Sequence, residues 1–310
     1  MSVRPPIPAG LEQQRALGPD WGAWLDRLPA LAGVLLDEWE LAPDGAAWHG
    51  HCSLVLPVTG RTGERQALKI TFDGDDESRH EALALQHWGG HGVVRLVRAD
   101  PGRRALLLER LHERDLADLD DTAACEVLGD LYGRIRRPAP PQLATVGSYV
   151  GRWVEPLAAL PRDAPLPHRL VDQARHLAAD LLAAPPERPV IVHGDLHQHN
   201  VLAADREPWL VIDPKPMAGD QHYEPAPALW NCWERLVAAG DVRAGVRHRF
   251  HTLVDTAGLD EDLARDWVVV RMVVNASWSL QDAERERRAL DAGERDWITR
   301  CIAIAKAVQD

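Results

Sequence analysis

Residues 190–214 read VIVHGDLHQHNVLAADREPWLVIDP, and this stretch decides how the rest of the chain is interpreted. Its three short apolar runs, at 190–192, 200–202 and 209–212, are β-branched or aromatic and are separated by polar turns, so they are predicted to be strands. Polar side chains stand at strand ends and in the loop between, where the backbone fixes them and solvent reaches them: Asp195, Asn200 and Asp213. The pattern predicts a functional hairpin.

The spacing of these polar residues is typical of phosphoryl transfer from ATP. Asn200 follows Asp195 by five residues, as in the catalytic loop of kinases. An aspartate can accept the proton of a hydroxyl group, and an asparagine and a second aspartate can hold Mg²⁺. We therefore predict that Asp195 is the catalytic base, that Asn200 and Asp213 are metal ligands, and that ATP and Mg²⁺ are required.

Composition limits the class of protein. The chain has 310 residues, 45% of them hydrophobic, which is enough to bury a full core. No apolar run is long enough to span a membrane, and residues 1–10 lack the apolar stretch of a signal peptide, so a cytoplasmic protein is expected. Four scattered cysteines without a C-x-x-C pair argue against a disulfide framework or a structural zinc site.

The net charge of −12 limits the kinds of partner that the protein is expected to bind. An acidic surface repels nucleic acid and anionic membranes and attracts a cationic small molecule. We therefore expect a small-molecule substrate, with no nucleic-acid or membrane partner. A monomer and a homodimer both remain open.

The periodicity of apolar residues changes character near residue 110. Before it, residues 11–37 have helical spacing with an interruption at Pro29, and one helix is predicted at 76–88. Strands are predicted on either side of that helix, at 46–58, 66–72, 93–98 and 104–109. After it, helices are predicted at 121–136, 144–160, 166–183, 225–238, 243–256, 260–281 and 284–308.

This arrangement predicts an α+β protein with a protein-kinase-like two-lobed fold. The N-terminal lobe, residues 1–110, would be a nucleotide-binding small antiparallel sheet with one helix, preceded by N-terminal helices. The C-terminal lobe, residues 111–310, would be mainly helical and would contain the hairpin 190–214 and the substrate site.

Lysine is scarce, and this draws attention to the three that occur: Lys69, Lys215 and Lys306. A composition so rich in arginine would have supplied arginine wherever a guanidinium sufficed, and a compact ammonium differs from it in a crowded phosphate pocket. We predict that Lys69, in a strand, contacts the nucleotide and is held by Glu81, 12 residues later. Glu77 is the competing partner. Lys215 suits the edge of the site and a structural salt bridge equally well.

Two further nucleotide contacts are predicted from position along the chain. Backbone amides around Gly50 and the hydroxyl of Ser53, in the predicted strand segment 46–58, are candidates to approach the phosphates, although an ordinary turn fits equally well. Main-chain groups of Glu109 and Leu111, where an apolar strand enters the linker between lobes, are candidates to bind the adenine edge. The alternative is an edge strand without a ligand.

The histidines of the central stretch admit another interpretation. His193, His197 and His199, with nearby aspartates, could bind zinc in a metal-dependent hydrolase. The kinase pattern also accounts for Lys69, whereas the hydrolase pattern uses only this block. We therefore expect His193 to fix the catalytic loop through hydrogen bonds. A nucleotide-binding pseudokinase is the non-enzymatic alternative, and the complete catalytic set argues against it.

Candidates for the substrate site follow the second aspartate. The acidic ones could receive a cationic substrate or form a solvated face, and the tryptophan could line a cleft or belong to the core. They are Asp220, Glu224, Trp230 and Glu234.

Taken together, these motifs resemble the aminoglycoside and hydroxyurea phosphotransferase family. The resemblance rests on HGDLHQHN at 193–200, IDPK at 212–215 and GDQHYEPA at 219–226, with HEALAL at 80–85 and LLLERL at 106–111. It runs from about residue 30 to the C-terminus and is strongest for streptomycin phosphotransferases acting at the 6-hydroxyl.

The resemblance implies a kinase-like fold, ATP, Mg²⁺, and an acceptor hydroxyl on an aminoglycoside antibiotic such as streptomycin, or hydroxyurea. It also implies antibiotic resistance as the role, and the functions given above for Asp195, Asn200, Asp213 and Lys69. One position departs from the family. Where such enzymes often have an aromatic residue followed by Asp-Pro, this chain has Glu224 before Pro225, which bears on the identity of the acceptor.

Overall fold

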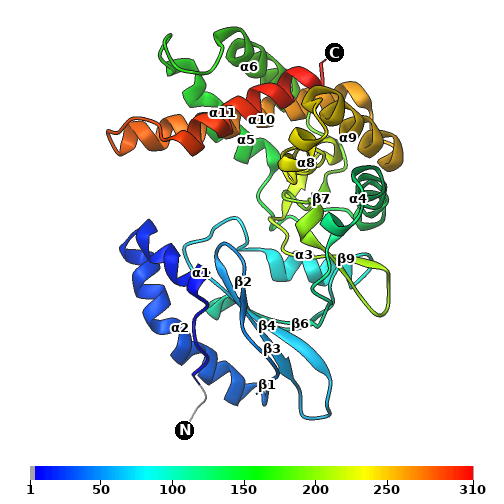
Figure 1. The fold of residues 1–310 in the computed structure, drawn as a ribbon. Helices are drawn as coiled ribbons and strands as arrows, with labels where there is room; N and C mark the ends of the chain where they lie inside the picture. Colours follow the sequence, from blue (N-terminus) through cyan, green and yellow to red (C-terminus); the bar gives the residue numbers. More distant parts are fainter. Residues whose placement is uncertain (1–3, 310) are drawn as a thin grey trace. The chain divides into compact units, whose positions relative to one another are not determined.

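The computed structural model describes residues 4–309 and divides the chain into two compact units (Figure 1). The first unit contains the residues up to Glu113 together with Leu202–Lys215, and the second contains Arg114–Val201 and the residues from Pro216 onward. The stretch 190–214 was predicted to belong entirely to the C-terminal lobe, whereas 202–215 packs with the first unit. Residues 1–3 and 310, at the ends of the predicted lobes, lie outside the described residues.

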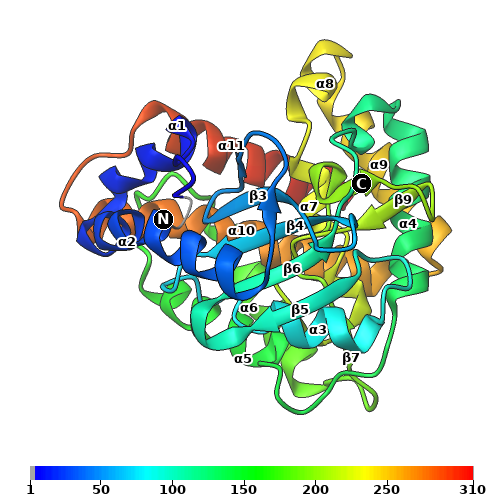
Figure 2. The same cartoon turned by 90° about the horizontal axis from the view of Figure 1, so that it is seen from below.

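An antiparallel sheet forms the centre of the first unit, as predicted. Its strands lie in the order β1–β3–β4–β6–β5, with β2 paired to β3, and Figure 2 shows β3, β4, β6 and β5 side by side. Their bounds are β1 (Ala42–Pro43), β2 (Trp48–His49), β3 (Ser53–Thr59), β4 (Arg65–Thr71), β5 (Leu96–Asp100) and β6 (Ala105–Glu109). Lys69 on β4 is opposite Val55 on one side and Leu106 on the other, so it stands in the interior of the sheet.

Helices use the two faces of this sheet differently. The helix α2 (Pro19–Glu38), preceded by α1 (Ala9–Glu12) and η1 (Gln13–Leu17), buries its apolar stripe against one face, which includes Leu68 and Ile70 of β4. Because side chains alternate along a strand, Lys69 points to the opposite face, toward α3 (Glu81–Trp88). The predicted interruption at Pro29 is wrong: this residue lies inside α2. Burial of the surrounding stripe outweighs the backbone hydrogen bond that proline removes.

The stretch 190–214 does not form a single hairpin. Its first strand, β7 (Val190–Val192), pairs with β10 (Met217–Gly219) in the second unit, while β8 (Val201–Ala203) pairs with β9 (Trp209–Val211). Hydrogen bonds from Val94 N to Val211 O (2.8 Å), from Val211 N to Gly92 O (2.9 Å) and from His112 N to Ala203 O (2.9 Å) attach the β8–β9 hairpin to the first unit. These main-chain bonds explain why 202–215 belongs there.

The second unit is mainly helical, as predicted. In it α4 packs against α9, and α10 packs against both α6 and α11. Figure 1 shows α10 and α11 side by side. The helix bounds are α4 (Asp121–Ile135), α5 (Val146–Val154), α6 (His168–Ala183), α7 (Ala226–Trp230), α8 (Trp233–Ala238), α9 (Val242–Ala257), α10 (Glu261–Arg285) and α11 (Ala292–Ala307). Short 3₁₀ turns lie between them, at η3 (Leu116–Asp118), η4 (Glu155–Ala159), η5 (Gln198–Asn200) and η6 (Gln221–Tyr223), and the first unit adds η2 (Pro101–Arg103).

Two predicted helices differ from the observed ones. The helix predicted at 225–238 is divided into α7 and α8 by Cys232, whose φ of +50° is incompatible with a continuous α-helix. The helix predicted at 284–308 begins only at Ala292, because Asp291 and Glu294 form a capping box there. No helix within residues 4–309 is long and apolar enough to cross a membrane.

Candidate active site

Lys69 lies at the centre of a buried ion-pair cluster in the first unit. Its Nζ is 2.7 Å from both carboxylate oxygens of Glu81 and 2.6 Å from Oδ1 of Asp213. The side chains of Lys69 and Glu81 are almost fully buried, while that of Asp213 is 32% exposed. The predicted pair between Lys69 and Glu81 is confirmed. Glu77, the competing candidate, donates its amide N–H to Asp75.

The backbone of Asp213 is strained. Its φ is +55°, in the left-handed region that non-glycine residues rarely adopt. Such a conformation costs about 1–3 kcal/mol and is found preferentially at functional sites. The strained residue is the one whose carboxylate reaches Lys69, so the conformation places a chemically useful group.

The electrostatics of the cluster keep Lys69 charged. Burial alone would lower the pKa of Lys69, but the negative charges of Asp213 and Glu81 outweigh burial and raise that pKa. Burial also raises the pKa of Glu81, against the opposing effect of the ammonium. One ammonium therefore faces two carboxylates, and the more exposed of them, Asp213, has the oxygen chemistry that a divalent cation prefers.

A second lysine of the first unit occupies a similar environment. Lys215 Nζ is 3.3 Å from Oδ2 of Asp75, and the same oxygen accepts from Cys52 Sγ (3.1 Å) and Ser78 Oγ (2.6 Å). Burial would lower the pKa of Lys215, but the negative charges of Asp213 and Asp75 outweigh burial and raise it. The salt bridge that the sequence offered as one alternative for Lys215 is therefore present.

The other predicted nucleotide contacts also have structural partners within the first unit. The amide of Gly50 donates to Ser53 O (3.0 Å), which closes the turn between β2 and β3, and Ser53 itself is buried. The amide of Glu109 donates to Arg95 O (3.0 Å), and its carboxylate accepts from Arg206 at 2.7–3.0 Å. Leu111 lies just beyond β6 and is half-buried.

In the second unit, a short loop after β7 holds Asp195. Gly194 has φ +79°, a conformation that suits glycine at this tight turn. The amide of Asp195 donates to His193 Nδ1 (3.2 Å), so His193 fixes the loop through a hydrogen bond, as predicted. Asn200 Nδ2 donates to Asp195 O (2.8 Å). This bond fixes the orientation of the Asn200 side-chain amide through Nδ2 and does not involve its Oδ1.

The histidines do not support a zinc site. His197 Nδ1 accepts from the amide of His199 (3.3 Å), whereas His199 contacts Asp115 Oδ2 (2.8 Å) and Cys232 Sγ (3.6 Å). Within residues 4–309, no group of three or more His, Cys, Asp or Glu side chains is placed to hold a metal ion. The metal-dependent hydrolase interpretation therefore has no structural support.

Glu224, predicted as a candidate to contact the substrate, is buried and contacts the backbone instead. Its side chain is buried, and its carboxylate accepts the backbone amides of His193 and Gly194, the latter at 3.2 Å. Burial raises the pKa of Glu224 to about 7, although the amide of His193 favours the charged form. The residue braces the backbone of the loop that carries Asp195, and its assignment to the substrate site is corrected accordingly.

Sequence reasoning missed two residues that hold the same loop. Arg271 donates to Gly194 O and to Tyr223 O (3.4 Å), and its guanidinium lies 4.4 Å from the centre of the Tyr223 ring. Tyr132 donates to Glu224 O (3.2 Å). A signal for Arg271 was available, because it is the single charged residue in the apolar run VVVRMVV at 268–274. Such a charge in an apolar helix requires a partner.

The remaining substrate candidates are spread over the second unit. The ring of Trp230 lies 5.1 Å from the guanidinium of Arg271 and edge-on to Trp297, and Glu234 is exposed in the first turn of α8. The structure therefore does not bring these two together with Asp220.

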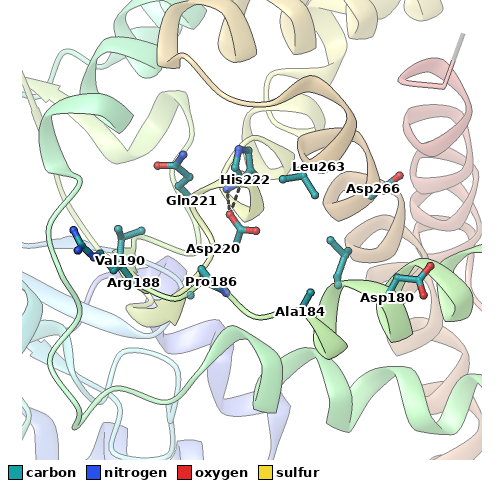
Figure 3. Close-up of a pocket in the computed structure, with 12 residues that line it drawn as sticks. Asp180, Ala184, Pro186, Arg188, Val190, Asp220, Gln221, His222, Leu263 and Asp266 are labelled. Atoms are coloured by element: carbon teal, nitrogen blue, oxygen red, sulfur yellow. Dashed lines mark hydrogen bonds and ion pairs between the residues drawn. The ribbon is translucent and has the colours of Figure 1, made fainter.

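Asp220 lines a cavity of about 480 Å³ formed by the end of α6, the β7–β10 pair and α10 (Figure 3). Its carboxylate lies 2.5 Å from His222 Nδ1 and accepts from Trp267 Nε1 (3.2 Å). Val190, at the start of β7, also lines this cavity, whereas Asp195 follows the other end of that strand. The cavity and the loop that carries Asp195 thus lie at opposite ends of β7.

Comparison with known proteins identifies the family. Residues 38–283 match the family model described as aminoglycoside/hydroxyurea antibiotic resistance kinase. A streptomycin 6-kinase of Streptomyces glaucescens is 42% identical over 285 residues, covering 90% of this chain and 92% of the relative. A hydroxyurea phosphotransferase of Kitasatospora aureofaciens is 39% identical over 289 residues, covering 90% and 81%.

Solved structures agree on the fold. The crystal structure of aminoglycoside phosphotransferase APH(4)-Ia superposes with a TM-score of 0.57 at 18% identity, covering 90% of this chain and 98% of that one. The predicted protein-kinase-like fold is confirmed. The chain belongs to the aminoglycoside/hydroxyurea antibiotic resistance kinase family and is a small-molecule phosphotransferase.

Proposed function

We propose that this protein is an ATP-dependent kinase that phosphorylates a hydroxyl group of a cationic aminoglycoside such as streptomycin. Hydroxyurea is the second candidate acceptor, because a hydroxyurea phosphotransferase is nearly as similar as the streptomycin 6-kinase. The observation that carries the proposal is the cluster of Lys69, Glu81 and Asp213. A buried ammonium held by two carboxylates suits the binding of nucleotide phosphates. The cytoplasm, where ATP is present, is the expected compartment.

Lys69, steadied by Glu81, would contact the phosphates of the nucleotide. Asp213 and Asn200 are the proposed ligands of Mg²⁺. Their donor chemistry fits, since a carboxylate and an amide oxygen are ligands that Mg²⁺ accepts, and the Asn200 amide is oriented by its bond to Asp195 O. When bound, Mg²⁺ would neutralise charge on the phosphate oxygens.

Asp195 would be the catalytic base. Its carboxylate would accept the proton of the acceptor hydroxyl as that oxygen attacks the γ-phosphorus, while the bond from phosphorus to the β-phosphate oxygen breaks and ADP leaves with the electron pair. The bonds from Glu224, Arg271 and His193 hold the loop around Asp195. Such positioning supplies much of the rate in phosphoryl transfer.

The end of β6 would bind the adenine. The amide of Glu109 faces Arg95 and that of Arg110 faces Arg65 O (3.3 Å), so successive peptide groups alternate in direction. Continued alternation would point the main chain of Leu111 away from β4, where a base edge could reach it. Ser53 and the turn at Gly50 remain the candidates for covering the phosphates.

A coupled ADP-release assay tests the proposal. Streptomycin, other aminoglycosides and hydroxyurea would be offered as acceptors with ATP and Mg²⁺, and we expect phosphorylation of streptomycin or hydroxyurea. ATP binding without turnover on any acceptor would favour a pseudokinase. Zinc in the purified protein with no nucleotide-induced rise in Tm would favour the hydrolase.

Two variants test the residue roles in the same assay. Asp195→Asn should lower kcat by roughly 10²-fold or more, the usual contribution of a general base, and Asp213→Ala should abolish turnover with the fold intact. The matched control is Asp205→Asn, since Asp205 is 91% exposed on the β8–β9 hairpin. A rate near that of the wild type for Asp195→Asn would remove this residue from the base role.

A further inference from the structure

We propose that Lys215 is a second phosphate-contacting residue, whose ammonium binds an oxygen of the γ-phosphate of ATP and is positioned by Asp75. This inference rests on the proposed kinase function. The inference extends that function by assigning a catalytic role to Lys215, a residue whose sequence context fits a purely structural salt bridge equally well.

The choice of lysine at position 215 favours this role. The chain has 35 basic side chains, and three of them are lysines. Two of these three, Lys69 and Lys215, belong to the first unit, and Lys215 follows Asp213 by two residues. Arginine forms stronger bidentate salt bridges with carboxylates, so a purely structural pair in this chain would be expected to use it. A lysine beside Asp213 indicates a need for a compact ammonium.

The carboxylate that holds Lys215 is itself held by several hydrogen bonds. Asp75 Oδ2 accepts from Lys215 Nζ (3.3 Å), Ser78 Oγ (2.6 Å) and Cys52 Sγ (3.1 Å). Ser78 is held in turn by Arg104, whose Nη2 lies 2.9 Å from Ser78 Oγ. The side chains of Lys215 and Asp75 are 16% and 12% exposed. Asp75 therefore steadies Lys215 much as Glu81 steadies Lys69.

The location of the Lys215 ammonium within the first unit also favours this role. Lys215 Nζ lies 3.9 Å from Sγ of Cys52, in the turn between β2 and β3 that also contains Gly50. It is thus next to the turn proposed to cover the phosphates and two residues from the strained Asp213. Contacts with Asp75 and Cys52 use at most two of the three N–H donors of an ammonium. A donor therefore remains for a phosphate oxygen.

The chemistry assigned to Lys215 is electrostatic. It forms no covalent bond and transfers no proton. Its positive charge would stabilise the negative charge on the γ-phosphoryl oxygens as the bond to the β-phosphate oxygen breaks, and a preorganised charge of this kind is effective because it needs no rearrangement during the reaction. The γ-phosphate is the group that ATP has and ADP lacks, which makes the role measurable by binding alone.

Calorimetric titration with ADP and with a non-hydrolysable ATP analogue, both with Mg²⁺, tests the assignment. In Lys215→Met, the Kd for the analogue should rise about tenfold or more, the worth of a hydrogen bond to a charged group, while the Kd for ADP changes by less than about threefold. Lys215→Gln, which removes the charge but keeps a polar end on the side chain, should show the same selective loss and serves if Lys215→Met does not fold. Lys306→Met, which removes the exposed lysine of α11, is the matched control and should bind both nucleotides as the wild type does.

Other results would overturn the assignment in distinguishable ways. A fall in Tm with an unchanged ratio of the two Kd values would reduce Lys215 to a structural salt bridge. Equal weakening of both nucleotides would mean that the ammonium does not discriminate the γ-phosphate. If the wild-type protein bound neither nucleotide, the kinase proposal itself would fail, and this inference with it.

Discussion

The two carboxylates around Lys69 contact its ammonium in different ways. Glu81 contacts it with both oxygens, and Asp213 with one. If Glu81 were neutral, the remaining attraction would draw Lys69 toward Asp213 and away from the position proposed for its contact with the nucleotide. The attraction of Glu81 for the Lys69 ammonium thus offsets that of Asp213 and keeps Lys69 in place.

Glu81→Gln should therefore impair turnover more than folding. We expect kcat/KM for ATP to fall by about 10²-fold, as for other small displacements of a positioned group, because Lys69 loses a negative partner but stays paired with Asp213. Steady-state kinetics and thermal unfolding measure the two effects separately. Glu77→Gln, one turn earlier, is the control. A kcat/KM within about threefold of the wild type would contradict the role given to Glu81.

The buried Glu224 predicts a pH dependence of stability. Burial raises its pKa to about 7 from an ordinary value of 4.5, so the folded protein binds a proton more tightly than the unfolded chain. The stability contributed by this group is complete below about pH 4.5 and is lost as the pH rises through 7. The Tm of the wild type relative to that of Glu224→Gln should therefore decrease between about pH 5 and pH 8. Glu234→Gln, at an exposed site, should show no such trend. A Tm difference that does not change with pH would refute the shift.

At the scale of elements, local patterns predicted most of the fold. The strand pattern around Lys69 and the helix pattern of 121–136 depend on periodic apolar residues, and the structure has β4 and α4 there. The misses have non-local causes. Pro29 remains in α2 because sheet side chains bury the helix, and β10 is a strand because β7 pairs with it across a long separation in the chain. Neither partner can be read from the neighbouring sequence.

The same distinction applies to the candidate site. The pair between Lys69 and Glu81 was predicted from their spacing, and so was the role of His193 in fixing its loop, although its partner, the amide of Asp195, was not. The role of Glu224 was not predicted. Its position in the chain, soon after Asp213, suggested a contact with the substrate and says nothing about a buried contact with His193. An acidic side chain near a motif can serve the backbone as well as a ligand.

The β8–β9 hairpin ends at the segment that carries Asp213, and Arg206 fastens it. Its guanidinium bonds the carboxylate of Glu109 and the carbonyl of Val93 (2.5 Å), and its side chain is 21% exposed. Arg206→Ala should lower the free energy of unfolding by about 1–2 kcal/mol, the worth of a partly buried charged hydrogen bond, and should raise KM for ATP because the hairpin orients Asp213. Urea unfolding and steady-state kinetics are the measurements. Arg61→Ala, in an exposed turn, is the control. An unchanged KM would show that the hairpin does not depend on this arginine.

At the scale of the whole molecule, the proposed catalytic groups are divided between the two units. Lys69 and Asp213 belong to the first, and Asp195 and Asn200 belong to the second. Each set is held by contacts within its own unit, the first by the ion-pair cluster and the second by Glu224 and Arg271. Local bracing in each unit therefore preserves the geometry of the reacting groups independently of the other unit.

The overall charge predicts how salt affects the choice of acceptor. With a net charge of −12, the protein attracts a polycationic acceptor over long range, and salt screens this attraction over a Debye length of about 8–10 Å at physiological strength. Between roughly 0.02 M and 0.3 M salt, KM for streptomycin, which carries two guanidinium groups, should rise several-fold. KM for hydroxyurea, which is uncharged, should change little. Measuring both acceptors with one enzyme preparation at saturating ATP cancels any effect of salt on nucleotide binding or folding. An equal response for the two acceptors would mean that the acidic charge plays no part in capturing the substrate, and any preference for a cationic acceptor would then have to come from contacts in the site alone.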